Sequence, residues 1–221
     1  MKNGLVIILA SLLVTLTQAQ DLAVPQGFDI LPIPEIGWQM LKPKDWLCVV
    51  HHNGDHLTLC VYREPQPAKG LNGTGISILI FSRLTEMQKH LSPSQYVLRT
   101  IEESRASHQI VSMEPLTVYG KIKRFAYSID REGPVDKSVE YHYSICDFAC
   151  DETDTLIEIR FGCPRRQWKK GDPIWKTINP SIDRNLEAKR EVPNQAAEPR
   201  RAAVTAPAGA GARASGAPGS P

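Results

Sequence analysis

Residues 76–101 read ISILIFSRLTEMQKHLSPSQYVLRTI, and the spacing of their apolar side chains changes along the stretch from that of a strand to that of a helix. Ile76–Phe81 is rich in β-branched and aromatic residues, which favours a central strand. Ser92–Gln95 then supplies a capping serine, a proline at the first helical position and a glutamine three residues after the cap. Apolar residues follow on one face, so the pattern predicts a helix from Ser92 to Ala106.

Short strands are predicted on both sides of this helix. They are Ile36–Pro43, Leu47–His52, His56–Arg63, Ile110–Val118, Lys121–Asp130, Ser138–Cys150 and Thr155–Phe161. Because short turns join consecutive strands, we expect them to pair antiparallel. A short final helix is expected to begin at Asp172-Pro173 and to end before Pro180. The order of strands, helix, strands and helix predicts an α+β fold, an antiparallel β-sheet flanked by helices on its faces.

The beginning of the chain has the features of a secretory signal. Lys2 gives it a positive start, and the apolar run Leu5–Val14 is too short to span a bilayer as a helix. Thr17 and Ala19 are small residues spaced as at a signal-peptidase site. We therefore expect residues 1–19 to be a cleaved signal peptide. The mature protein would then be exported, periplasmic or secreted, without a transmembrane segment.

The far end differs in composition from the rest. Residues 187–221 are dominated by Ala, Gly, Pro, Ser and Arg, and such a segment buries too little apolar surface to offset its chain entropy. We expect a disordered tail, either a plain spacer or a contact for an anionic surface through its arginines Arg200, Arg201 and Arg213. The remaining residues, 22–184, have the length of a single domain. The net charge of +2 gives no support for a nucleic-acid partner, which would need a clustered basic surface.

Three parts of this domain resemble the PsbP-like family. The first is the opening stretch 37–46, with its Gly-Trp, proline and second tryptophan. The second is the central helix followed by Glu114–Gly120 and a long meander of strands. The third is the ending Trp168–Ile182, which looks like the closing helix of the family. The resemblance covers most of residues 28–184.

The resemblance implies a sheet sandwiched between helices and a non-catalytic binding or assembly module. The family includes extrinsic photosystem II subunits and bacterial envelope relatives. This sequence departs from the photosynthetic members in its alanine-rich tail and its histidine-rich segment 48–60, so photosystem binding is not carried over. The expectation is an exported module of the cell envelope with a protein partner. No catalytic residue, cofactor or metal ligand is transferred, because the family has no catalytic motif.

The segment CVVHHNGDHLTLC, residues 48–60, carries the Asn-Gly signal of a β-hairpin. A two-residue turn at Asn53-Gly54 would place Cys48 opposite Leu59 and separate the two cysteines onto opposite faces. A three-residue loop would place Cys48 opposite Cys60, where a disulfide could form. We interpret the segment as a plain exposed hairpin and leave its register, and with it the disulfide, open.

A metal-binding or thiol-based envelope protein is the alternative function. His51, His52 and His56 at the hairpin tip form a partial metal site at most, since zinc takes three or four ligands. Cys146 and Cys150 would share one face of a strand about 13 Å apart, too far for a disulfide. Weaker candidates are Cys163, the isolated histidines His90, His108 and His142, the glycosylation-type motif Asn72-Gly73-Thr74, and the basic residues Arg165, Arg166, Lys169 and Lys170 beside Trp168.

Overall fold

The computed structural model describes residues 23–53, 56–63, 73–88, 90–133 and 136–191. The chain divides into one unit of residues 1–191 and a second of residues 192–221, and the whole second unit lies outside the described residues. The predicted signal peptide, residues 1–19, also lies outside them, as does the predicted tail from residue 192 onward.

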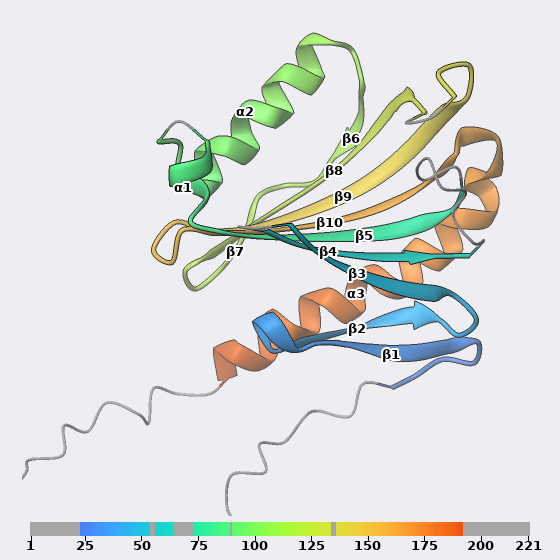
Figure 1. The fold of residues 1–221 in the computed structure, drawn as a ribbon, viewed down its shortest axis with the longest axis horizontal. Helices are drawn as coiled ribbons and strands as arrows, with labels where there is room; N and C mark the ends of the chain where they lie inside the picture. The colour runs from blue at the N-terminus through green and yellow to red at the C-terminus, as the bar shows by residue number, and fades with distance from the viewer. Residues whose placement is uncertain (1–22, 54–55, 64–72, 89, 134–135, 192–221) are drawn as a thin grey trace, which may run out of the picture. The chain divides into compact units, whose positions relative to one another are not determined.

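An eight-stranded sheet forms the centre of the first unit, in the order β3-β4-β5-β10-β9-β8-β6, with β7 paired to β8 (Figure 1). Its strands are β3 (Leu47–Asn53), β4 (His56–Tyr62), β5 (Gly75–Ser82), β6 (Ile110–Met113), β7 (Thr117–Tyr119), β8 (Ile122–Glu132), β9 (Glu140–Cys150) and β10 (Thr155–Pro164). All of the pairings are antiparallel. The predicted central strand Ile76–Phe81 falls within β5, which lies inside the sheet between β4 and β10.

Elements pack on both faces of this sheet, and we name each face after its long helix. On the α2 face, helix α2 (Pro93–Ala106) packs against β6, β8 and β9. On the α3 face, helix α3 (Trp168–Glu191) packs against β10 and against β2 (Trp38–Pro43). β2 pairs with β1 (Phe28–Ile33) in a separate two-stranded sheet, and the short helix η1 (Pro34–Ile36) joins them (Figure 1). The α+β prediction is therefore confirmed.

Helix α2 begins where the sequence predicts. The Ser92 side chain accepts a hydrogen bond from the Gln95 backbone at 3.4 Å, and the Gln95 side chain accepts one from the Ser92 backbone at 3.0 Å. Asp151, in the turn between β9 and β10, accepts hydrogen bonds from the Ser94 backbone at 2.9 Å and from its hydroxyl at 2.7 Å. The first turn of the helix is thereby attached to the sheet. The four-residue helix α1 (Leu84–Met87) precedes α2 in the chain.

The final helix corrects the sequence analysis. Helix α3 follows the short helix η2 (Arg165–Gln167) and runs through both Pro173 and Pro180. Pro180 has no N–H to continue the hydrogen-bond ladder, which is why we predicted a stop. The buried residues of the inner face are Trp175, Ile178, Ile182 and Leu186. Their spacing is that of a helix, and their burial stabilises the segment beyond the proline. The domain therefore continues past residue 184, and the predicted tail is helical up to Glu191.

Two further differences concern strands. The predicted strand Ile110–Val118 is two strands, β6 and β7, with an irregular pairing near Ser112 and an interruption at Pro115. Proline cannot donate to a ladder, so it divides the segment. Strand β1 was not predicted. It pairs with β2 alone, and its Pro32 is a residue that strands disfavour.

Four aromatic rings form the centre of the α3-face core. Phe161 of β10 is fully buried, and its ring centroid lies 6.4 Å from that of Trp46, 5.9 Å from that of Trp168 and 5.8 Å from that of Trp175. A Cβ at Gly171 would approach the Phe161 ring to 3.1 Å, which explains a glycine in the first turns of α3. Tryptophans from both ends of the domain therefore meet at one phenylalanine.

We expect Phe161→Ala to lower the free energy of unfolding by about 3–5 kcal/mol, because it removes a buried ring and leaves a cavity among three tryptophans. Urea denaturation followed by tryptophan fluorescence measures the change. Val118→Ala is the control, since Val118 is 53% exposed and should change the free energy of unfolding by no more than about 0.5 kcal/mol. A Phe161→Ala loss as small as that of the control would contradict the central role of this ring.

Candidate functional site

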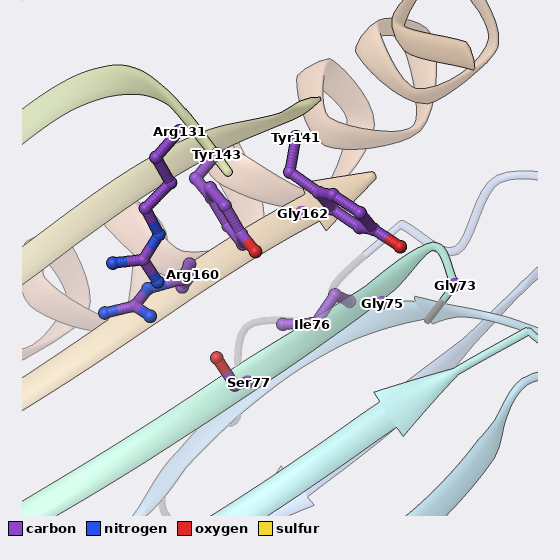
Figure 2. A pocket seen from close by; sticks show the side chains of 9 residues that line it. All are labelled: Gly73, Gly75, Ile76, Ser77, Arg131, Tyr141, Tyr143, Arg160 and Gly162. Carbon is purple, nitrogen blue, oxygen red and sulfur yellow. The ribbon is translucent and has the colours of Figure 1, made fainter. Parts of the chain in front are cut away.

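A small pocket of about 100 Å³ opens on the α2 face of the sheet, and Figure 2 shows the residues that line it. It is lined by Gly73, Gly75, Ile76, Ser77, Arg131, Tyr141, Tyr143, Arg160 and Gly162. These residues come from the end of β8, the start of β9, the second half of β10, and β5 with the residue Gly73 shortly before it. The pocket is thus built mainly on strands, which hold side chains more precisely than loops do.

The strand register brings the polar residues together. Arg131 of β8 lies opposite Tyr141 of β9, and Arg160 of β10 lies opposite Ser77 of β5. Tyr143 lies opposite Gly162. Side chains alternate between the faces of a strand, so Arg131, Tyr143 and Arg160 all point to the α2 face.

Two glycines make room for the tyrosine. A Cβ at Gly162 would come within 2.6 Å of the Tyr143 ring, so only glycine lets that ring lie across β10. The neighbouring Gly75 is also closely approached, since its Cβ would stand 3.0 Å from the Val61 carbonyl oxygen. The rings of Tyr141 and Tyr143 are stacked, with centroids 5.9 Å apart and planes 23° from parallel. The tyrosines therefore form a packed aromatic wall.

Two guanidinium groups face this wall. The central carbon of the Arg131 guanidinium lies 4.6 Å from the Tyr143 ring centroid, and that of Arg160 lies 5.7 Å from it. Figure 2 shows both groups at the same side of the tyrosine. Arg160 donates to Glu158 at 2.5 Å, whereas its Nε is buried with no hydrogen-bond partner among the described residues. The site therefore offers positive charge and hydrogen-bond donors to an anionic group.

A buried carboxyl group lies further along β9, one of the strands that line the pocket. Asp147 of β9 is opposite Glu158, and Tyr127 donates a hydrogen bond to its Oδ2 at 3.1 Å. Burial raises the pKa of Asp147 well above its ordinary value, and the nearby Glu158 carboxylate raises it further. The Tyr127 hydrogen bond and the Arg160 charge oppose this shift without cancelling it. The charged form of Asp147 is therefore disfavoured, and Glu158 is the carboxylate that pairs with Arg160.

The predicted hairpin is present, but its register differs from both alternatives. Asn53 pairs with His56, so Cys48 lies opposite Val61 and Cys60 lies opposite Val49. The two cysteines are on opposite faces of the sheet, and neither forms a disulfide. This register removes the Cys48–Cys60 alternative.

The same register separates the tip histidines. His51 and His52 are neighbours on β3 and point to opposite faces. His56 stacks on Phe81, with ring centroids 5.5 Å apart. The three imidazoles therefore do not converge as a set. Within the described ranges, no group of three or more metal-ligating side chains is placed to hold an ion.

Cys146 and Cys150 lie on one face of a strand, as the sequence predicted. Cys146 and Cys150 share the α3 face of the extended strand β9, and Cys146 is buried. Burial raises the pKa of the Cys146 thiol far above its ordinary value, although the nearby Arg124 opposes the shift. Burial also raises the pKa of Cys163 to about 11. Thiols of this kind are poor nucleophiles, because the thiolate is the reactive form.

The remaining sequence candidates do not meet at the pocket. His90 and His108 occupy left-handed turns, with φ values of 67° and 57°. His142 contacts Asp130 at 2.6 Å through Nδ1 and packs on Trp168 on the α3 face. Of the basic residues near Trp168, Arg165 pairs with Asp130 at 2.9 Å and with Glu140 at 2.8 Å, and Arg166, Lys169 and Lys170 are exposed. Asn72 of the glycosylation-type motif lies outside the described residues, as do the tail arginines.

The sequence analysis missed every polar residue of the pocket. Arg131, Tyr143 and Arg160 are separated by many residues and belong to no motif. The available signal was the pair Tyr141 and Tyr143, two large residues on one face of a predicted strand. The residues that meet these tyrosines at the pocket depend on how four strands pair, and that pairing cannot be read from the sequence alone.

We expect Asp147→Asn to stabilise the protein at neutral pH. A carboxyl whose pKa is raised by folding keeps its proton in the folded state and loses it in the unfolded state, so stability falls as pH rises above the unfolded pKa of about 3.9. The fall reaches about 1.4 kcal/mol per pH unit, and asparagine cannot contribute to it. Urea midpoints of both proteins from pH 4 to pH 8 measure the difference. It should be smallest at pH 4 and grow with pH, and a constant difference would contradict a raised pKa of Asp147.

Comparisons with known proteins add a structural match. No family model matches the chain, and no curated protein matches it in sequence. Its structure is similar to the solution structure of cyanobacterial PsbP (CyanoP) from Synechocystis, with 10% identity over 72% of this chain and 93% of that chain, and a TM-score of 0.43. A crystal structure from Bacteroides thetaiotaomicron matches with 13% identity and a TM-score of 0.32, over 63% of this chain and 42% of that one. The first of these matched structures is a PsbP protein, from the family whose resemblance the sequence analysis noted.

Proposed function

We propose that the protein is an exported, non-catalytic binding or assembly module of the cell envelope, and that a partner protein docks at the pocket on the α2 face. The observation that carries the proposal is the pair of guanidinium groups, Arg131 and Arg160, held against the Tyr143 ring in an open pocket. Arginine and tyrosine are the residue types that most often anchor protein interfaces.

The build of the pocket supports binding more than chemistry. Its walls are strands of a continuous sheet, and the Tyr143 ring is fixed by close contact with Gly162. A rigid site loses little conformational entropy when a partner binds, so more of the contact energy appears as affinity. Its two guanidinium groups supply hydrogen-bond donors and positive charge, which favour binding of an anionic group.

The two versions of the alternative function are less well supported. A thiol-based activity needs a thiol with a lowered pKa, whereas burial raises the pKa of Cys60, Cys146 and Cys163. A metal site at the hairpin tip needs converging histidines, whereas His51 and His52 point to opposite faces of β3.

Export is testable by intact mass. We expect the protein recovered from the exported fraction of a secreting host to lack residues 1–19, because the apolar run and the small residues before position 20 fit signal-peptidase cleavage. Mass spectrometry of alkylated, unreduced protein reports the cleavage and the free thiols together. Full-length protein found only inside the cell would contradict export.

Partner docking is testable by photo-crosslinking in the native host. We expect a crosslinking amino acid at Ser77, which lines the pocket, to capture a discrete partner, and Arg131→Gln in the same chain to abolish the product. Crosslinks from position 98 on α2 should not depend on Arg131, since Leu98 is 47% exposed and lies outside the pocket lining. Arg166→Gln is the matched charge control, because it removes one exposed arginine from η2. A Ser77 product that survives Arg131→Gln, or no product at all, would overturn pocket-mediated docking.

A further inference from the structure

We propose that the pocket is a carboxylate-binding site and that Arg131 is its anchor. This inference rests on the proposed function and deepens it, because it names the chemical group that the pocket recognises.

The charge balance leaves one guanidinium unmatched. Arg160 forms an ion pair with Glu158 at 2.5 Å. Arg131 forms no ion pair with any residue in the described part of the chain, and its partner is the face of the Tyr143 ring. Glu158 balances the charge of Arg160, so Arg131 contributes a net positive charge beside the Tyr143 ring. One added carboxylate would balance Arg131 and could accept charge-assisted hydrogen bonds from its fork of N–H groups.

The size of the pocket restricts the ligand to a small group. Pockets that enclose whole drug-sized ligands or cofactors measure about 300–1,000 Å³. The pocket here measures about 100 Å³, so it admits the end group of a molecule and not a cofactor. A carboxylate at the end of a chain fits this description, with the rest of its molecule outside the opening.

Charge and shape favour a carboxylate over a phosphate. A phosphate group carries up to two negative charges near neutral pH, whereas only one of the two pocket guanidinium groups, that of Arg131, has no carboxylate partner among the described residues. The flat rings of Tyr141 and Tyr143 line the opening beside the donors, which suits a planar group with a short apolar stem. The carboxylate could belong to a partner protein, as its chain terminus, or to a free small acid.

The test is a titration of the ¹⁵N-labelled mature protein, observed through its backbone amides and its arginine Nε–H signals. Sodium acetate, inorganic phosphate, and an N-acetylated tripeptide in its free-acid and C-terminal amide forms are added at constant ionic strength. We expect acetate to shift Arg131, Arg160 and Ser77 in a saturable way. Arg131→Gln should weaken the acetate Kd about tenfold or more, as expected for loss of a charge-assisted pair. Arg166→Gln, the matched charge control, should leave it unchanged.

Comparison of the acetate and peptide titrations distinguishes a carboxylate at the chain terminus of a partner protein from a free small acid. Free-acid peptide that binds more tightly than acetate, with no binding of the amide, supports a partner's chain terminus. Acetate that binds at least as tightly as the peptide supports a free small acid. No saturable shift with either carboxylate, an acetate Kd unaffected by Arg131→Gln, or tighter binding of phosphate than of acetate would overturn the assignment.

The outcomes also distinguish this inference from the proposed function. Crosslinks that depend on Arg131, without any carboxylate binding, would leave partner docking standing and remove the carboxylate. Carboxylate binding that depends on Arg131, without a Ser77 crosslink, would support the carboxylate site and contradict docking of a partner protein there.

Discussion

The contact of Phe161 with three tryptophans is the constraint on which the arrangement of the domain depends. Trp46 comes from the segment before β3, and Trp168 and Trp175 come from α3, so one ring on β10 joins the two ends of the domain. Aromatic contacts of this kind add about 0.5–1.5 kcal/mol each beyond the burial of their area. Because β10 is fixed from the α3 face, the residues that alternate with Phe161 are fixed on the α2 face. Arg160 and Gly162, the immediate neighbours of Phe161, are two of the residues that form the pocket.

Local signals in the sequence were sufficient where the structure is decided locally. The capping residues around Ser92 predicted the start of α2, because their hydrogen bonds span only three residues. Pro180 misled the analysis, because a proline is a local signal whereas the burial of Ile182 and Leu186 against the sheet is not. Tertiary packing of an amphipathic face outweighed the missing backbone hydrogen bond.

Register was the level at which sequence reasoning failed for the candidate sites. The hairpin was predicted from Asn-Gly, but its pairing places Asn53 opposite His56, and this shift decides the faces of Cys48 and Cys60. β4 is paired on both sides, to β3 and to β5, and its alternate residues Leu57, Leu59 and Val61 are buried in the α3-face core. A turn signal contains no information about that core. The pocket could not be predicted from the sequence for the same reason, because its residues come together only when four strands pair.

The buried carboxyl group connects the stability of the sheet to the charge of the pocket. Asp147 and Glu158 lie directly opposite each other, and two like charges in that position would destabilise the sheet. Burial and the Glu158 carboxylate both raise the pKa of Asp147, which disfavours a second negative charge beside the Glu158–Arg160 ion pair. An ionised Asp147 would add negative charge behind Arg160 and weaken the attraction of the pocket for an anion. The raised pKa of Asp147 therefore limits like-charge repulsion within the sheet and limits the negative charge beside Arg160.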